Sequence, residues 1–428
     1  VLCFVTVALD GFDTAIIGFI ASDLVQEWGV QKSDLGPVMS AALVGLAFGA
    51  LTAGPMADRI GRKKVLVLSI LVFGGFSLIT AFAASLTQLT VLRFLTGLGL
   101  GAAMPNAATL MSEYAPERRR ALMVNLMFVG FPIGSSMGGF ISAWMIPHYG
   151  WQSVLILGGV MPLALAVALI FLLPESARYL AVKNKSQQQI SGILRRIAPL
   201  PENTQFVLQE AGQVKDQSAL GVIFSPRYLV GTFMLCLTYF MGLLIFYLLT
   251  SWLPLLIRET GATLSQASVI TALFPLGGGI GVLVLGALMD KINPHRALGI
   301  IFAVGGLFTM AIGYAGVNFP LLCSLAFVSG ACLNGANTGM NALSARFYPT
   351  QARATGSSWM HGVGRIGAIL SAFAGAEMLA MGLDFRSVFL ILGIPAALTV
   401  LGLAAKSYWA AGPVENNPAI TASLRSPS

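Results

Sequence analysis

Charged side chains are scarce in this sequence. Asp, Glu, Lys and Arg make up only 10% of its 428 residues, whereas soluble globular chains carry about 25%. A chain so poor in charge cannot cover itself with a polar surface. The composition therefore excludes an ordinary soluble domain and indicates that the lipid bilayer is the solvent of this protein.

Cysteine and histidine are also too few and too scattered to form a metal centre or a disulfide framework. Cys3, Cys236, Cys323 and Cys332 each lie in an apolar segment without CxxC spacing, so we interpret them as small buried hydrophobic residues. No HExxH motif, Cys/His cluster or suitably placed GxSxG motif occurs. The sequence therefore predicts no enzyme, no cofactor and no metal.

What the chain has in quantity is long apolar runs. Windows of about 20 residues, the length that crosses a ~30 Å hydrocarbon core, occur six times before residue 174 and six times after residue 227. They predict an all-α membrane protein with twelve transmembrane helices. The predicted organisation is an N-terminal six-helix half (1–174), a polar linker (175–226), a C-terminal six-helix half (227–405) and a disordered tail (406–428). Because Val1 already lies in an apolar run, we expect a short polar segment before it.

Basic residues are distributed unevenly between the loops. Lys and Arg crowd into alternate loops and the linker, whereas the other loops hold only Lys32, Arg258 and Arg386. Cytoplasmic loops of membrane proteins collect basic residues, so this pattern predicts a multi-pass protein with both termini in the cytoplasm. The net charge of +8 thus reflects topology, and we expect no nucleic-acid partner.

The two halves of the chain share short sequence patterns. GPMAD at residues 54–58 recurs as GALMD at 286–290, and Pro116 with Arg120 recurs as Pro349 with Arg353 at nearly the same spacing. Such repeats predict two pseudo-symmetric six-helix halves, with a substrate site between them near the bilayer midplane.

Two carboxylates lie within the first predicted span, in LDGFDTA. Asp10 and Asp13 are three residues apart and share one helix face, while Gly11 allows a neighbouring helix or a ligand to come close. Inserting even one ionised carboxylate at membrane depth costs about 2.5–3.5 kcal/mol. We interpret the pair as a proton carrier; a structural cap or a helix-packing contact is the alternative.

The eleventh span, SSWMHGVGRIGAIL, carries a second charged group. His361 and Arg365 are four residues apart and share one helix face. Arg365 keeps its proton in practice, so in an apolar helix it must face a cavity, a carboxylate or both. We predict that Arg365 is the counter-ion of an anionic ligand, that His361 lines the same site and that Trp359 forms a ring contact. Packing is the alternative for His361 and Trp359.

Several polar residues of other spans complete the predicted site. Arg93, at the start of RFLTGLGLG, would bias the protonation of a nearby acid, or would snorkel to a membrane surface as a structural residue. The other candidates can donate hydrogen bonds to ligand oxygens or stack on a planar ligand, with interhelical bonding and core packing as the alternatives. These candidates are Asn334, Asn337 and Asn341 of the tenth span and Tyr239 of the seventh.

The loop GPMADRIGRKK joins the second and third spans. It resembles the G-x-x-x-D-R-x-G-R-R-K signature of the major facilitator superfamily, where it acts as a latch that stabilises the outward-open state. The alternative is a basic loop that serves topology alone. The resemblance predicts a gating role for the following residues of the loop and of its repeat: Gly54, Asp58, Arg59, Gly61, Arg62 and Asp290.

The motifs above, together with SEYAPERRRA, LPESARYL, LTSWLP and ARFYPTQARATG, resemble the aromatic acid:proton symporter family, and among its members the 4-hydroxybenzoate/protocatechuate transporters of soil bacteria. The resemblance implies a monomeric secondary transporter of the bacterial inner membrane that imports a small aromatic carboxylate with a proton by alternating access. Asp10 and Asp13 match the family's acidic pair. GFPIGSSMGG only partly matches the drug-antiporter pattern, which disfavours export. Import of another organic acid or a sugar, or ligand sensing beside transport, is the alternative.

Overall fold

The computed structural model describes residues 1–116, 119–183, 219–289 and 291–409. Within these ranges, 12 helices are long and apolar enough to cross a membrane, which confirms the number predicted from hydropathy. The predicted tail beyond residue 409, Asp290 and most of the linker (184–218) lie outside the described residues.

The N-terminal half contributes six spans, two of which are built from two helical segments. They are α1 (Leu2–Trp28), η1 (Lys32–Asp34) with α2 (Leu35–Ile60), α3 (Arg62–Thr80), α4 (Leu86–Tyr114), α5 (Arg120–Phe128) with α6 (Gly130–Tyr149), and α7 (Gln152–Leu172).

The C-terminal half has the same number of spans, and two short helices lie between the halves in the sequence. The spans are α11 (Pro226–Glu259), α12 (Leu264–Met289), α13 (Pro294–Ile312), α14 (Phe319–Phe347), α15 (Thr350–Ala380), and α16 (Phe385–Ile391) with α17 (Gly393–Trp409). The short helices are α8 (Ala177–Val182) and α10 (Ala219–Ile223).

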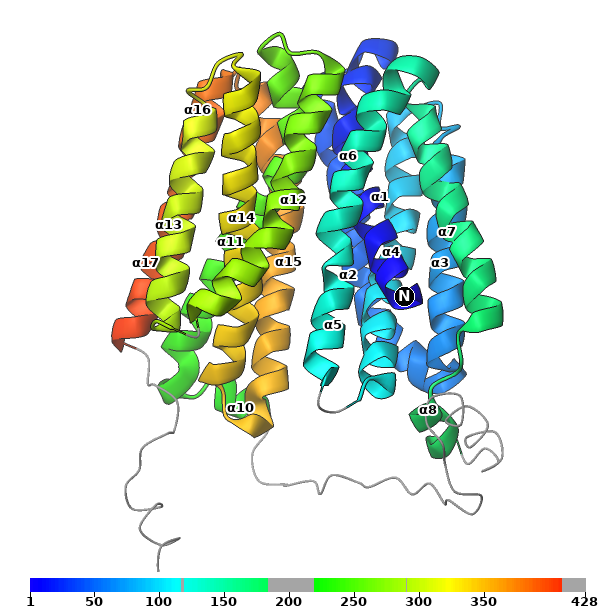
Figure 1. Ribbon diagram of the computed structural model, residues 1–428, viewed down its shortest axis with the longest axis vertical. Coiled ribbons are helices and arrows are strands. Elements are labelled where there is room, and N and C mark those ends of the chain that lie inside the picture. The colour runs from blue at the N-terminus through cyan, green and yellow to red at the C-terminus, as the bar shows by residue number, and fades with distance from the viewer. Residues whose placement is uncertain (117–118, 184–218, 290, 410–428) are drawn as a thin grey trace, which may run out of the picture.

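The two halves stand side by side (Figure 1) and are built alike. In the first half α1 packs on α6, α2 on α4 and α3 on α7; in the second half α11 packs on α15, α12 on α14 and α13 on α17. In both halves the first span thus pairs with the fifth, the second with the fourth and the third with the sixth. The fold thus has the internal symmetry that the repeated motifs predict.

Glycines let the paired helices approach to backbone contact. A Cβ atom at Gly97 of α4 would overlap the carbonyl of Ala42 in α2, and one at Gly11 of α1 would overlap the carbonyl of Phe131 in α6. Small residues at such crossings are the usual means of packing helices in a membrane. Gly11 therefore accommodates a neighbouring helix, one of the two roles that the sequence left open.

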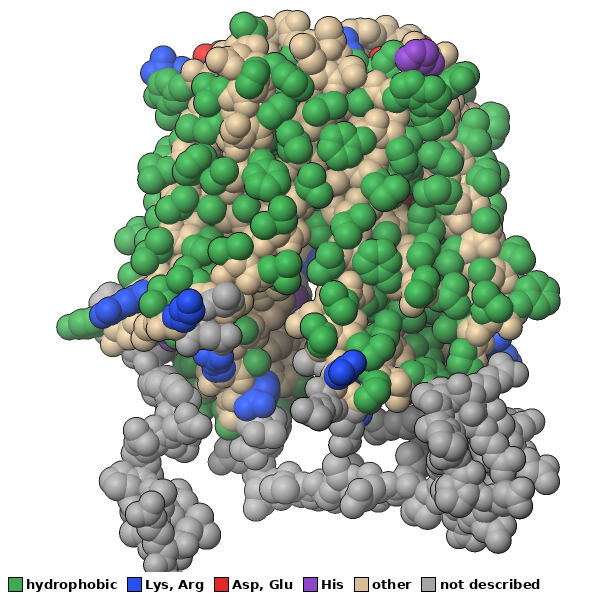
Figure 2. Space-filling model, in the orientation of Figure 1, with side chains coloured by type: hydrophobic (Ala, Val, Ile, Leu, Met, Phe, Trp, Pro, Cys, Tyr) green, Lys and Arg blue, Asp and Glu red, His purple; other side chains and the backbone are tan. Residues whose placement is uncertain are grey.

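The halves meet at one end of the bundle and part at the other. At the end that carries η1, which we call the closed end, η1 and α2 pack on α15, and Lys32 Nζ lies 2.5 Å from Glu259 Oε1 of α11. At the opposite end, which we call the basic end, Figure 2 shows a hollow between the halves with Lys and Arg side chains around it. The α2–α3 junction, with Arg59, Arg62 and Lys63, lies at the basic end.

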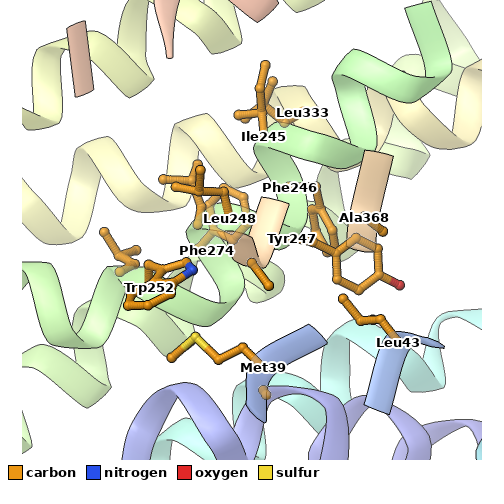
Figure 3. Packing of buried hydrophobic residues seen from close by; sticks show 14 of the residues in the cluster. Met39, Leu43, Ile245, Phe246, Tyr247, Leu248, Trp252, Phe274, Leu333 and Ala368 are labelled. Atoms are coloured by element: carbon orange, nitrogen blue, oxygen red, sulfur yellow. The ribbon is translucent and has the colours of Figure 1, made fainter. Parts of the chain in front are cut away.

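An apolar seam separates the middle of the molecule from the closed end. Figure 3 shows Met39 and Leu43 of α2 directed at Trp252 and Tyr247 of α11, so that side chains of both halves belong to one buried cluster. Removing this apolar surface from water stabilises the closed arrangement of the two halves. Arg93 of α4 and Tyr247 of α11 both line a small cavity beside this seam.

Candidate functional site

A fully buried ion pair joins α1 and α4 inside the N-terminal half. Arg93 Nη1 donates to Asp13 Oδ1 at 3.0 Å and Nη2 donates to Oδ2 at 2.8 Å, while Ser77 Oγ of α3 donates to Oδ1 at 3.1 Å. The side chains of Asp13 and Arg93 are both 0% exposed, so Arg93 does not snorkel. Two parallel hydrogen bonds fix the geometry of the pair. Asp13 is thereby held as a partner of Arg93.

Asp10, one turn away on α1, is in a different situation. Its side chain is buried, Oδ1 accepts only a long hydrogen bond of 3.4 Å from Thr14, and Oδ2 has no hydrogen-bond partner among the described residues. The charges of Arg365 of α15, in the other half, and of Asp13 both act on it electrostatically. Among the described residues no cation is bonded to Asp10, in contrast to Asp13.

Arg365 is surrounded by aromatic side chains of its own half. Nη1 donates a 3.5 Å hydrogen bond to Tyr247 Oη of α11. Its neighbours on the same side are Tyr239 and His361, whose rings pack edge to face with centroids 5.1 Å apart. His361 is exposed and Arg365 is partly exposed, so this group opens toward the hollow. The structure thus brings together three residues predicted from sequence, Tyr239, His361 and Arg365.

The cavity between the halves beside Arg93 is too small for a ring-shaped molecule. A cavity of about 10 Å³ lies between the halves, lined by residues that include Thr14, Leu43, Arg93 and Tyr247. A volume of this size holds about one water molecule. This cavity therefore has no room for an organic ligand.

The remaining predicted site residues are spread more widely. Asn337 donates a 3.2 Å hydrogen bond to the carbonyl of Gly242, so it serves as an interhelical tie between α14 and α11. Asn334 lies against Gly278 of α12, and Asn341 is exposed. Trp359 is not brought to Arg365: its ring packs edge to face on Phe224, 5.2 Å away, beside α10.

The predicted gating loop is tied to two other segments at the basic end. Gly61 ends α2 with φ of 105°, a conformation that favours glycine. Arg62 forms an ion pair with Glu113 of α4, and the Lys63 backbone N–H donates to Glu175 Oε1 at 2.9 Å. Gly54, Asp58 and Arg59 are exposed. The loop is therefore tied to α4 and to the segment that follows α7.

Sequence reasoning did not find several residues that hold these groups in place. Ser77 donates to Asp13, and Glu113 bonds to both Arg62 and Ser176, whose Oγ donates to Glu113 Oε2 at 2.6 Å. One signal was present: Glu113 and Glu175 are acids in otherwise basic loops. An acid in such a loop is a natural partner for the arginines of the gating motif.

Twelve membrane-crossing helices in two like halves, with a buried carboxylate in one half and an arginine of the other half acting on its charge, are the architecture of a secondary transporter. The model of the Major Facilitator Superfamily matches residues 3–260 and 235–427. The chain belongs to this superfamily, whose members are transporters rather than enzymes.

Similar proteins cover nearly the whole chain. It is 54% identical over 407 residues to the 4-hydroxybenzoate transporter PcaK of Pseudomonas putida (95% of this chain, 91% of the relative). It is 47% identical over 423 residues to the gallate transporter of Pseudomonas putida (99% and 93%). Among solved structures, the inward open conformation of the xylose transporter XylE from E. coli superposes with a TM-score of 0.74 at 17% identity, covering 99% of this chain and 98% of that one. This last likeness shows the fold alone.

Proposed function

We propose that the chain imports small aromatic carboxylates, such as 4-hydroxybenzoate or protocatechuate, by proton symport across the bacterial inner membrane. The names of the similar proteins, a 4-hydroxybenzoate transporter and a gallate transporter, support the class of ligand. The observation that carries the proposal is that Asp10 is buried in one half while Arg365 of the other half acts on its charge, so that a titratable acid and a fixed cation are coupled between the halves.

Arg365 binds the ligand carboxylate in this proposal. A guanidinium offers a planar, bidentate match to a carboxylate, and a carboxylate leaving water needs such a fixed cation. The rings of Tyr239 and His361 lie beside Arg365 and supply aromatic surface for the ligand ring. Asn334 and Asn341 are the candidates for the ring hydroxyl.

Asp10 carries the coupled proton, and Asp13 stays ionised in its pair with Arg93. When Asp10 is protonated, the positive charge of Arg365 is available to the anionic ligand. When the proton leaves, Asp10 competes with the ligand for Arg365, which favours release. Coupling follows from this competition, since each ligand taken up requires one neutral Asp10.

The basic end is cytoplasmic in this proposal, as the positive-inside pattern predicts. Both termini then lie in the cytoplasm, and the hollow of Figure 2 faces inward. Alternating access requires the closed end to open and the basic end to close around the site. The exposed Asp58 and Arg59 would meet the other half when the basic end closes. The proposal takes the chain to act as a monomer.

Transport by purified protein in liposomes tests this function. We expect 4-hydroxybenzoate to accumulate when the outside is acid, and to stop accumulating when a protonophore collapses the gradient. A panel of benzoates, dicarboxylates and hexoses defines the ligand class. Gradient-driven uptake of hexoses instead of benzoates would assign the chain to another substrate, and uptake insensitive to the protonophore would remove proton coupling.

The ion pair at the closed end gives a prediction about the balance of states. Lys32→Gln removes the contact with Glu259, which joins the two halves at 2.5 Å. Both side chains are partly exposed, so the pair is worth at most about 1 kcal/mol. We expect the outward-open population to rise by up to about five-fold, measured as the distance distribution between spin labels at Gln31 and Gln266.

A matched control is available at the same end. Arg386 bonds to Tyr314 within the C-terminal half, at 3.0 Å, so Arg386→Gln removes a charge without touching the seam. An equal shift in both variants would show that general surface charge, and not the pair, sets the balance.

A further inference from the structure

The small cavity between the halves brings together polar groups of three helices. Its polar lining residues come from both halves: Thr14 of α1 and Arg93 of α4 on one side, and Tyr247 and Ser251 of α11 on the other. The other lining residues are apolar. The volume of about 10 Å³ is close to the space that the centre of one water-sized probe needs. The cavity is therefore a polar pocket of the size of one water molecule.

The guanidinium of Arg93 has one N–H group that its ion pair does not use. Nη1 and Nη2 donate to Asp13, whereas Nε is buried and has no hydrogen-bond partner among the described residues. Buried donors of this kind are nearly always bonded to protein or to ordered water. The side chain of Arg93 is 0% exposed, so a partner for Nε has to lie inside the protein. The cavity that Arg93 lines offers the space for one.

The hydroxyl groups of the cavity have bonding capacity of the complementary kind. Tyr247 Oη accepts a hydrogen bond from Arg365 Nη1 at 3.5 Å, so its own proton is free for another partner. Thr14 Oγ1 donates to Asp10 Oδ1 at 3.4 Å, and its lone pairs can still accept a bond, as can those of Ser251. Together with the unused N–H described above, the cavity thus offers two donors and two acceptors.

Charge and size select the occupant of this cavity. The positive charge of Arg93 disfavours a cation beside it, and the volume leaves no room for an organic ligand. A water molecule is neutral, accepts two hydrogen bonds and donates two. Its bonding pattern therefore matches the two donors and two acceptors of the lining residues.

We propose that the cavity is a binding site for one ordered water molecule that bridges the two halves. The water accepts hydrogen bonds from Arg93 Nε and Tyr247 Oη and donates to the hydroxyls of Thr14 and Ser251. Tyr247 is then a positioning residue, because its hydroxyl is held between Arg365 and the water. The water adds a polar tie beside the apolar seam, and this tie has to break when the closed end opens. Its part in transport rests on the proposed function, whereas its presence does not.

Radical footprinting by X-ray pulses tests the proposal on the full chain in lipid. The protein is mixed rapidly with water enriched in the heavy oxygen isotope and is then exposed to the pulse, and mass spectrometry locates the oxidised side chains. Met39 and Leu43 line the cavity and are buried, whereas Met381 is 67% exposed. We expect Met39 and Leu43 to be oxidised. Their added oxygen should remain light after that of Met381 has become heavy, because a bound water exchanges more slowly than bulk water.

Hydroxyl deletions on each side of the cavity test the bridge itself. Tyr247→Phe and Thr14→Val each remove one hydroxyl with little change of shape. Each should speed isotope exchange at Met39 about five-fold, the effect of one lost hydrogen bond. Tyr348→Phe is the matched control, because it removes a buried tyrosine hydroxyl of the same half that bonds to Thr232 at 2.9 Å, outside the cavity lining. It should leave the exchange unchanged.

Three outcomes would overturn the proposal. A native protein without oxidation at Met39 and Leu43 would have no water in the cavity. Exchange at these residues as fast as at Met381 would describe bulk water that enters freely. Faster exchange in only one of the two hydroxyl variants would describe a water held by one half alone. These measurements use neither ligand nor proton gradient, so their failure is distinguishable from a failure of the proposed function.

Discussion

Replacement of Arg365 by alanine should weaken binding of 4-hydroxybenzoate by roughly 30-fold or more. Removing one partner of a desolvated charge pair costs about 2–5 kcal/mol, and the lower value already corresponds to this loss of affinity. The Arg365 guanidinium donates to Tyr247 Oη, whereas Arg93 is bound at both ends of its fork by Asp13. Equilibrium titration of the purified variant measures the loss.

Two companions make this prediction specific to the carboxylate. Arg365→Lys should recover only part of the affinity, because an ammonium keeps the charge but loses the planar fork. The uncharged amide of the same ligand should bind the native protein poorly and lose little more in the alanine variant. If acid and amide lose affinity equally, Arg365 supports the helix bundle and the carboxylate partner lies elsewhere.

The fold was predictable because each membrane span and each basic loop can be recognised from its own residues alone. Each apolar run of about 20 residues identifies a span without reference to the others, and repeated loop motifs identify the two halves. The six-residue helix α8 shows where this reasoning stops. Its docking on the gating loop depends on Glu175 and Ser176 meeting residues more than a hundred and about sixty positions away, Lys63 and Glu113.

The site was predictable by residue type but not by pairing. Spacing shows which residues share one face of one helix, and it placed His361 with Arg365 on α15 correctly. It does not show which helix that face meets. The bond between Asp13 and Arg93 joins positions 80 residues apart, and nothing local to either residue indicates the other.

The helical periodicity of α15 also predicts that Trp359 does not share a face with His361. Its separation of two residues from His361 already places the two side chains on nearly opposite faces of one helix. Because His361 borders the hollow, Trp359 must face away from it, as its contact with Phe224 shows.

Asp10→Asn should abolish uphill accumulation of the ligand while preserving exchange of ligand across the membrane. An amide is close to the shape of the neutral carboxyl, so Arg365 stays available to the ligand, but the amide carries no proton and uptake loses its link to the proton gradient. Proteoliposomes measure both quantities: accumulation under an inward proton gradient, and exchange of labelled ligand without one.

Asp13→Asn is the matched control for this last prediction, because it makes the same chemical change one turn away on α1. It leaves Arg93 buried and without its counter-ion, and breaking a buried pair in this way costs about 3–5 kcal/mol. We therefore expect Asp13→Asn to lower the thermal stability of the purified protein and to reduce exchange and accumulation together, whereas Asp10→Asn separates them. Full uphill accumulation by Asp10→Asn would show that the proton travels by another group. Loss of accumulation with retained exchange in Asp13→Asn, at unchanged stability, would transfer the proton to Asp13.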